Sequence, residues 1–203
     1  MTHAHLFAIG LALAALAGVR VYLTVFGVGL AGLMGWVELP AALQVTSSYW
    51  VLGTSGALAL VEFFADKIPG VDSVWDLLHT LLRVPVGAFL AASTLSADGH
   101  LGGVALASGA GVALLTHVLK SGTRALINTS PEPVSNWTAS LSEDAAVTGG
   151  LALAFVHPWI AMTLLVGVVA GFFLSVLWLF RKLARGIAAG TSKLGRLTAP
   201  GSK

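Results

Sequence analysis

The sequence predicts an all-α integral membrane bundle of about six transmembrane helices. Of the 203 residues, 56% are hydrophobic and only 10% are charged, whereas a soluble domain carries about 25% charged residues. The mean hydropathy of the chain is +0.88. Long apolar runs, separated by short segments with Pro or Gly, recur along the whole sequence. Because so few charges are available to cover a water-exposed surface, we expect the chain to be solvated mainly by lipid.

The apolar runs are each near the length of about 20 residues that a membrane helix needs. The expected spans are 6–34, 49–65, 75–95, 102–124, 137–156 and 159–180. The first run is longer than one span requires and carries Gly18 and Arg20 midway, so we expect it to be tilted or broken there. Its leader, MTHAH, lacks Lys and Arg, and the apolar run resumes after Arg20, which favours an uncleaved first helix over a signal peptide.

Basic residues gather at the C-terminal end, where no acidic residue follows position 180. We therefore divide the chain into a transmembrane helical domain, 1–180, and a basic cytoplasmic tail, 181–203. The tail is expected to contact anionic inner-leaflet lipids, and we expect no nucleic-acid partner. Lys67, Lys120 and Arg124 fall on the same expected side of the membrane, which predicts a multi-pass cell-membrane protein with both termini in the cytoplasm. The six basic residues of the tail are Arg181, Lys182, Arg185, Lys193, Arg196 and Lys203.

An internal repeat is indicated by the pattern P-x3-S-x-W-x11-G, which occurs twice at a fixed offset of 62 residues. Both occurrences lie in a loop that leads into a helix, so we predict two parallel helix–loop–helix repeats at about 50–95 and 112–157. An even number of spans separates them, so the copies should share an orientation and be related by an axis along the membrane normal. The paired positions are Pro69, Ser73, Trp75 and Gly87 with Pro131, Ser135, Trp137 and Gly149.

Three stretches of the sequence carry a family resemblance: EFFADKIPGVDSVWDLLHT, KSGTRALINTSPEPVSNW and SLSEDAAV. With them the chain resembles the bacterial membrane-protein family known as domain of unknown function 4126. The resemblance covers about residues 5 to 180 and leaves out the basic tail. It implies a polytopic membrane fold and brings no activity, cofactor or site residue.

Charged residues inside the expected spans form the candidate site. Asp76, His79 and Arg83 have the i, i+3, i+7 spacing of one helix face, and Asn136, Ser140 and Glu143 form a similar stripe. A charge at the centre of a membrane helix costs at least about 2.5–3.5 kcal/mol, so we expect these charges to face the interior and pair, with Arg83 reaching Glu143 or Asp144. The predicted polar intramembrane network is Arg20, Asp76, His79, Arg83, Glu143 and Asp144.

A second group is expected at the cytoplasmic mouth of the two hairpins: Glu62, Asp66, Arg124 and Asn128. The 62-residue offset matches Glu62 with Arg124, so we predict that this pair faces across the interface between the hairpins and is partly solvated. Asp66 and Asn128 would form a second such pair. A catalytic or cation-binding role for the two carboxylates is the alternative to an ion-paired surface.

Several chemistries have no support in the sequence. Cysteine is absent, and two terminal histidines without a carboxylate make a poor metal site, so we expect no metal and no cofactor. No catalytic residue can be named, because the phosphate-binding, nucleophile-elbow and zinc-protease motifs are all missing. His117 is expected to be a packed, hydrogen-bonded histidine. Gly109 and Gly111 belong to small-residue faces that favour close helix packing.

Three functions remain open. The first is a small transporter or channel-like protein for a small polar or ionic solute, expected to be a homodimer because six short helices enclose a polar path poorly. The second is a non-transporting structural or regulatory membrane protein whose buried charges only fix the helices. The third is a membrane enzyme acting on a lipid head group, with Asp76 and His79 as acid–base residues.

Overall fold

The computed structural model describes residues 3–68, 70–95, 102–129 and 133–198, and these residues form helices joined by short turns, without a strand. The all-α fold class is therefore confirmed. The elements in chain order are α1 (His3–Val19), α2 (Val21–Leu33), the 3-10 helix η1 (Ala41–Ser47), α3 (Tyr49–Ala65), α4 (Val71–Leu95), α5 (Gly103–Ile127), α6 (Pro133–Val156) and α7 (Pro158–Thr198).

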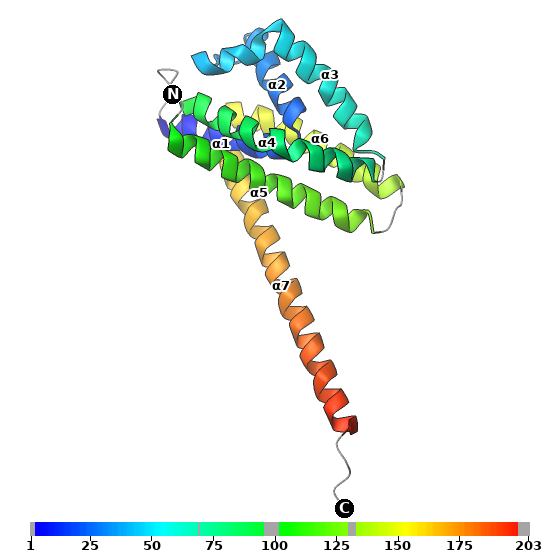
Figure 1. Cartoon of the computed structure of the whole chain (residues 1–203). Coiled ribbons are helices and arrows are strands. Elements are labelled where there is room, and N and C mark those ends of the chain that lie inside the picture. Colours follow the sequence, from blue (N-terminus) through cyan, green and yellow to red (C-terminus); the bar gives the residue numbers. More distant parts are fainter. Residues whose placement is uncertain (1–2, 69, 96–101, 130–132, 199–203) are drawn as a thin grey trace, which may run out of the picture. The chain divides into compact units, whose positions relative to one another are not determined.

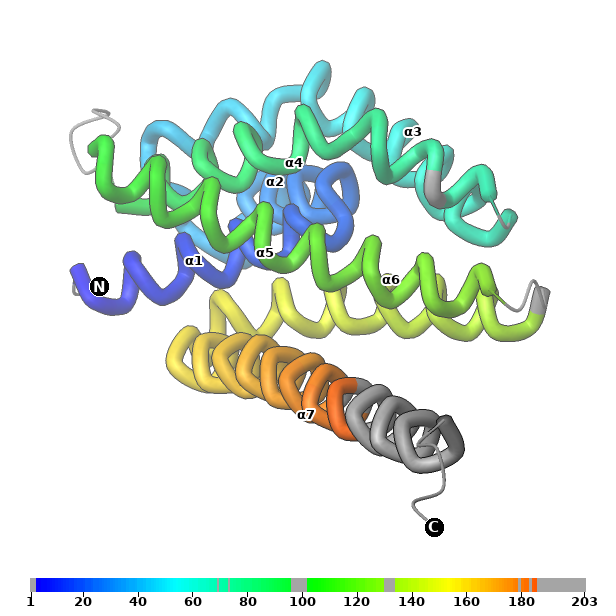
Figure 2. The backbone as a smooth tube through the Cα atoms, turned by 60° about the horizontal axis from the view of Figure 1, so that its bottom comes forward, coloured from blue at the N-terminus to red at the C-terminus, as the bar shows by residue number. Residues whose placement is uncertain are grey.

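The core of the first unit, residues 1–165, is built on three helices. α4 and α5 run side by side, and α1 packs against both (Figures 1 and 2). Glycines allow this close approach: Gly18 of α1 lies against Ala113 of α5, and Gly109 of α5 lies against the backbone of α4 at Gly87. In lipid no hydrophobic effect drives helices together, so association depends on close van der Waals packing. Small residues at the contacts allow that packing.

The chain breaks at Arg20, which is one of the two outcomes, a tilt or a break, that the sequence leaves open there. α1 ends at Val19 and α2 begins at Val21, and between them Arg20 has φ −141° and ψ 86°. Only Arg20 departs from helical geometry at this break, because its carbonyl accepts hydrogen bonds from the amide and the hydroxyl of Thr24. Figure 1 shows α2 leaving the line of α1 towards α3. The guanidinium of Arg20 is thereby placed at a bend in the backbone, where three helices meet.

The ends of the remaining helices follow local signals. Ser48 caps α3 by accepting a hydrogen bond from the amide of Val51, and α6 and α7 each begin with a proline, which suits the first helical position. Gly70, at φ +85°, forms the turn into α4, and its amide donates to the carboxylate of Asp72. This turn fixes the chain direction between Asp66 and the start of α4.

Fewer long apolar helices are found than the six expected spans. By length and composition, the described parts of the chain contain three helices that could cross a membrane, at 74–95, 103–127 and 158–182. A fourth is possible if η1 and α3, which meet at a bend of 63°, form one broken span or a re-entrant loop. α1 and α2 are short apolar helices because of the break at Arg20. A multi-pass membrane protein remains the interpretation of this pattern.

The second unit, residues 166–203, holds most of α7. α7 continues as one helix through position 180, where the sequence suggests that the tail begins, to Thr198. Its apolar stretch is exposed, and Lys182 lies over the ring of Trp178 with its Nζ atom 4.9 Å from the ring centroid.

Candidate functional site: a buried network of charged side chains

Ten charged side chains form one continuous set of ion pairs inside the first unit, which we call the charge network. It contains five cations and five carboxylates, and the cations are all the Lys and Arg residues that precede position 181. The formal charges therefore cancel within the network. Its members are Arg20, Lys67, Arg83, Lys120 and Arg124 with Glu62, Asp66, Asp76, Glu143 and Asp144.

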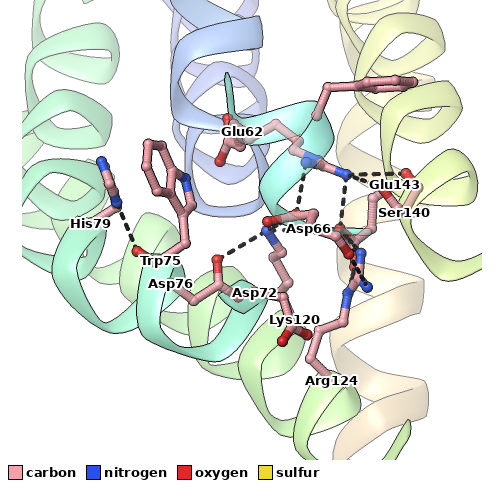
Figure 3. A network of polar contacts seen from close by, with 12 residues as sticks. Glu62, Asp66, Asp72, Trp75, Asp76, His79, Lys120, Arg124, Ser140 and Glu143 are labelled. Atoms are coloured by element: carbon pink, nitrogen blue, oxygen red, sulfur yellow. Dashed lines mark hydrogen bonds and ion pairs between the residues drawn. The ribbon is translucent and has the colours of Figure 1, made fainter. Parts of the chain in front are cut away.

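Asp66 lies at the centre of the charge network (Figure 3). It caps the C-terminus of α3, and its Oδ2 atom lies 2.7 Å from Nη1 of Arg20 and 2.8 Å from Nζ of Lys120. Arg124 adds a third cation at 3.8 Å. Asp66 is fully buried, so these cations offset the large cost of removing a carboxylate from water. One carboxylate thus joins the break at Arg20 to α3 and α5.

Arg83 is buried on α4 and pairs with two carboxylates. Its Nη2 atom lies 2.8 Å from Glu62 and 2.7 Å from Asp76, and Nη1 lies 2.8 Å from Nδ1 of His117. The prediction that Arg83 pairs is confirmed, but the predicted partners, Glu143 and Asp144, are wrong. The reason is that α4 packs along α5 and α1 instead of meeting α6.

Arg124, on α5, holds α6 to the network. Its Nε and Nη2 atoms donate to the two oxygens of Glu143 at 2.9 and 3.0 Å, a bidentate geometry that fixes the carboxylate. Its Nη1 atom donates to the carbonyl and side-chain oxygens of Asn136. The predicted partly solvated pair of Glu62 with Arg124 is therefore wrong: both side chains are buried, and Glu62 binds Arg83 instead.

The predicted pair of Asp66 with Asn128 is also replaced. Nδ2 of Asn128 donates to both carboxylate oxygens of Asp72, at 3.1 and 2.9 Å. This contact does connect the two hairpins, because Asp72 opens α4 and Asn128 follows α5. The hairpins therefore meet at their tips through Asp72 and Asn128, while Asp66 connects them through Lys120 and Arg124.

Lys67 closes the network near its exposed side. Its ammonium group donates to the carbonyl of Phe63 at 3.0 Å and to the hydroxyl of Ser140 at 3.3 Å, and lies 4.0 Å from Asp144. Burial lowers the pKa of Lys67 below its usual value, and Asp144 only partly offsets this effect. Ser140 also accepts a hydrogen bond from Arg20 at 2.9 Å, so this one hydroxyl serves two cations.

His79 does not join the charge network. Its Nδ1 atom lies 2.7 Å from the carbonyl of Trp75, and its ring stacks on Trp75 and meets Tyr22 edge-on. Figure 3 shows His79 beside Trp75, apart from the ion pairs around Asp66. Asp76, in contrast, is buried against Lys120 and Arg83. The two residues named for acid–base work therefore face different surroundings.

A groove reaches the network from one side, between α2, α3 and α6. Its volume is about 420 Å³, and three of its lining residues, Arg20, Glu62 and Asp144, are network members. The side chains of Glu143 and Asp144 are 18% and 20% exposed, whereas those of Asp66, Arg83 and Lys120 are at most 2% exposed. We call this hollow the α2–α3–α6 groove. The network is thus open at its α6 side and closed around Arg83.

Some buried polar atoms in the network have no hydrogen-bond partner among the described residues. They include one carboxylate oxygen of each of Glu62, Asp66 and Asp144, and the Nε atom of Arg20. No cluster of three or more His, Asp or Glu residues in the described ranges is arranged to hold a metal ion. Cations of the chain occupy the space between the carboxylates instead.

Lys67 and Lys120 belong to the site although the sequence pattern does not predict them there, and His117 is predicted only as a separate packed histidine. The packing of His117 is confirmed by its 2.7 Å hydrogen bond with Thr80, but it also contacts Arg83. A signal for this group was present, because His117, Lys120 and Arg124 repeat the i, i+3, i+7 spacing of the stripe on α4.

Comparisons with known proteins identify a family and no individual relative. A family model described as domain of unknown function (DUF4126) matches residues 7–181. Neither the curated proteins nor the solved structures contain a match to the chain.

Proposed function

The chain belongs to the DUF4126 family, and, since that family's description assigns no activity, we propose from the site geometry that it is a small transporter or channel-like protein. The cargo is a small polar or ionic solute that enters through the α2–α3–α6 groove. The charge network binds it there, at the residues that line the groove.

The observation that carries this proposal is a groove lined by three network members, Arg20, Glu62 and Asp144, of which Asp144 is partly exposed. Buried ionisable residues inside membrane proteins face a bundle interior or a water-filled cavity, and commonly mark the route of an ion or substrate. The helix break at Arg20 supports the same function, because transporters build their binding sites from discontinuous helices.

A structural role is the second candidate, and the closed part of the network favours it. Asp76, Arg83 and Lys120 are buried and pair with one another, which is what a network that only fixes helix register requires. An enzyme acting on a lipid head group has less support, because Asp76 is enclosed and His79 lies elsewhere.

The membrane location, the orientation and the oligomeric state of the protein are proposals as well. We propose a multi-pass cell-membrane protein with both termini in the cytoplasm, a tail held near anionic lipids, and a homodimer. Duplication of the hairpins is supported by their bounds: α3 and α5 end at Ala65 and Ile127, and α4 and α6 begin at Val71 and Pro133, each 62 residues apart. A cross-linking experiment in native membranes tests the homodimer.

Thermal denaturation and uptake together test the transport function. Purified protein is heated with inorganic phosphate, ethanolamine, leucine or spermidine, since a ligand of the folded state raises the melting temperature. Any probe that raises it is then offered, radiolabelled, to proteoliposomes. Thr148 is exposed and lines the groove, so Thr148→Trp should obstruct uptake and leave the melting temperature of the ligand-free protein nearly unchanged.

The outcomes separate the two candidates. Uptake that depends on the protein and is blocked by Thr148→Trp supports transport. If no probe raises the melting temperature and none enters the liposomes, the transport proposal fails and the structural role is favoured. If uptake is equal in the parent and Thr148→Trp, the groove is not the route.

A further inference from the structure

The α2–α3–α6 groove continues beyond its charged end. A second hollow of about 420 Å³ shares Leu23, Phe26 and Thr148 with it and extends along α2 and α6. We call this continuation the α2–α6 furrow. The lining then changes in character. Beyond the shared residues it is apolar except for the backbone and the indole N–H of Trp36: Gly27, Leu30, Ala31, Trp36, Val37, Leu151, Ala152, Phe155 and Val156.

The furrow is long enough for a hydrocarbon chain. The α2 residues that line it run from Leu23 to Ala31, about 12 Å at 1.5 Å per residue, and Trp36 and Val37 continue the lining beyond the helix. Half of a bilayer's hydrocarbon core measures roughly 15 Å. A small ion or metabolite would use only the charged end and would leave the furrow empty. A molecule with a polar head and an apolar chain would match both parts.

The charged end specifies the chemistry of the head. Glu62 is buried, and its Oε2 atom has no hydrogen-bond donor among the described residues; Oδ2 of Asp144 has none either. Arg20 is also buried, and its Nε atom has no acceptor there. Arg20, Glu62 and Asp144 all line the groove, and Asp144 shares its charge with Lys67 at 4.0 Å. A ligand that brings N–H donors together with an anionic acceptor would complement these three side chains. A primary ammonium with a phosphate group meets that description, and charge-assisted hydrogen bonds are the strong ones.

We propose that the groove and the furrow together bind a single-chain zwitterionic amphiphile of the lysophosphatidylethanolamine class. Its ammonium group donates to Glu62 and Asp144, its phosphate accepts from Arg20, and its acyl chain lies along the furrow towards Trp36. This inference uses the same groove as the proposed function but goes beyond it, because it assigns the groove and the furrow an amphiphilic ligand and not a small solute.

The test is equilibrium binding of radiolabelled lysophosphatidylethanolamine to the full chain in phosphatidylcholine nanodiscs. The choline head of the surrounding lipid carries no N–H donor and should not compete. Asp144→Asn alters the head site, and it should weaken binding about tenfold or more, as expected for the loss of one hydrogen bond to a charged group. Ala152→Trp fills the furrow, because Ala152 is exposed and lines it, and should weaken binding similarly.

Leu114→Trp is the matched control, since it adds the same indole at an exposed position of α5 outside the groove and the furrow. Saturable binding that both site variants weaken and the control retains supports the proposal. If both site variants bind as the parent does, the lipid only partitions into the nanodisc and the proposal is overturned. If leucine or phosphoethanolamine competes as well as the lysolipid, the amphiphile is the wrong class while transport of a small solute stands. If the lysolipid binds but no probe is taken up into proteoliposomes, the transport proposal fails while the binding proposal stands.

Discussion

At the scale of single residues, Arg83 is the side chain whose removal should cost most. It is fully buried between Glu62 and Asp76. In Arg83→Met, Asp76 keeps Lys120 as a partner, but Glu62 loses the one ion pair that the described structure gives it. Breaking a buried pair costs about 3–5 kcal/mol, so the free energy of unfolding should fall by that amount in a denaturant titration in detergent.

A double variant distinguishes the cost of a stranded charge from the cost of lost packing. In the double variant Arg83→Met with Glu62→Gln, the stranded carboxylate becomes a neutral amide, so most of the lost stability should return. Leu81→Ala is the control on the same helix, because Leu81 is exposed and should change the free energy of unfolding little. A double variant less stable than Arg83→Met would contradict this account of the network.

Lys67 should make stability depend on pH. Burial lowers the pKa of its ammonium group below 10.5 in the folded protein, so the unfolded chain binds more protons between the lowered pKa and that value. Stability therefore rises with pH across this window, and the penalty for burying the charge disappears once both states are neutral. Lys67→Met should lack this rise. The measurement is the difference in melting temperature between parent and variant as pH is raised from neutral; a constant difference would show that Lys67 does not titrate differently on folding.

The composition of the site was more predictable than its pairing. Arg20, Arg83 and Glu143 stand in apolar runs, and the cost of a charge in lipid requires them to be buried and paired. Which carboxylate meets Arg83 depends on which helices pack together, and the charge pattern carries no such information. The sequence places Lys67 and Lys120 as charges that flank the spans, because each lies near the end of an expected span. Their burial follows from the packing that brings Asp66 to Lys120, and Ser140 and Asp144 to Lys67.

At the scale of helices, the glycines decide the packing of α4 against α5. A Cβ atom at Gly109 would lie 2.6 Å from the carbonyl oxygen of Gly87 and 3.1 Å from Cα of Ala88, both backbone atoms that cannot move aside easily. Gly109→Ala should therefore destabilise the fold by about 1–3 kcal/mol, as overpacking does.

Gly111, two residues further along α5, provides the control for Gly109. A Cβ atom there meets nothing within 4 Å, so Gly111→Ala should be neutral or should stabilise the helix by up to about 1 kcal/mol. Denaturant titrations of both variants measure the contrast. Equal effects of the two substitutions would mean that α4 and α5 do not approach as closely as described.

The helices themselves were predicted unevenly. The positions of α4 and α5 follow from their apolar runs, and a tilt or a break near Arg20 follows from a charge in the middle of a long run. The number of spans does not follow from the sequence in the same way. An apolar run predicts burial in lipid or protein, but it does not distinguish a helix that crosses the membrane from a bent one. The 63° bend between η1 and α3 lies at Ser48, whose capping hydroxyl is the only local sign of it.

At the scale of the whole molecule, the network changes the basis of the predicted orientation. The positive-inside pattern places Lys67, Lys120 and Arg124 at the cytoplasmic surface, but all three side chains are buried. They cannot hold the folded protein against anionic lipid head groups. The basic residues that remain outside the network all belong to the segment after position 180, of which Arg181, Lys182 and Arg185 are exposed on α7.

The tail should therefore dominate the orientation of the protein in the membrane. A reporter that is active only in the cytoplasm, fused after Lys203, should be active in the parent chain, because basic residues near a span end stay on the cytoplasmic side. Replacing the six basic residues of the tail by Gln should lower its activity and raise that of a periplasmic reporter at the same position. Lys67→Gln removes one basic residue from the same predicted side without touching the tail, and it should reduce stability while leaving both reporters unchanged. If Lys67→Gln shifts the two reporters as far as the neutral tail does, the loop charges set the orientation during insertion, before the network closes around them.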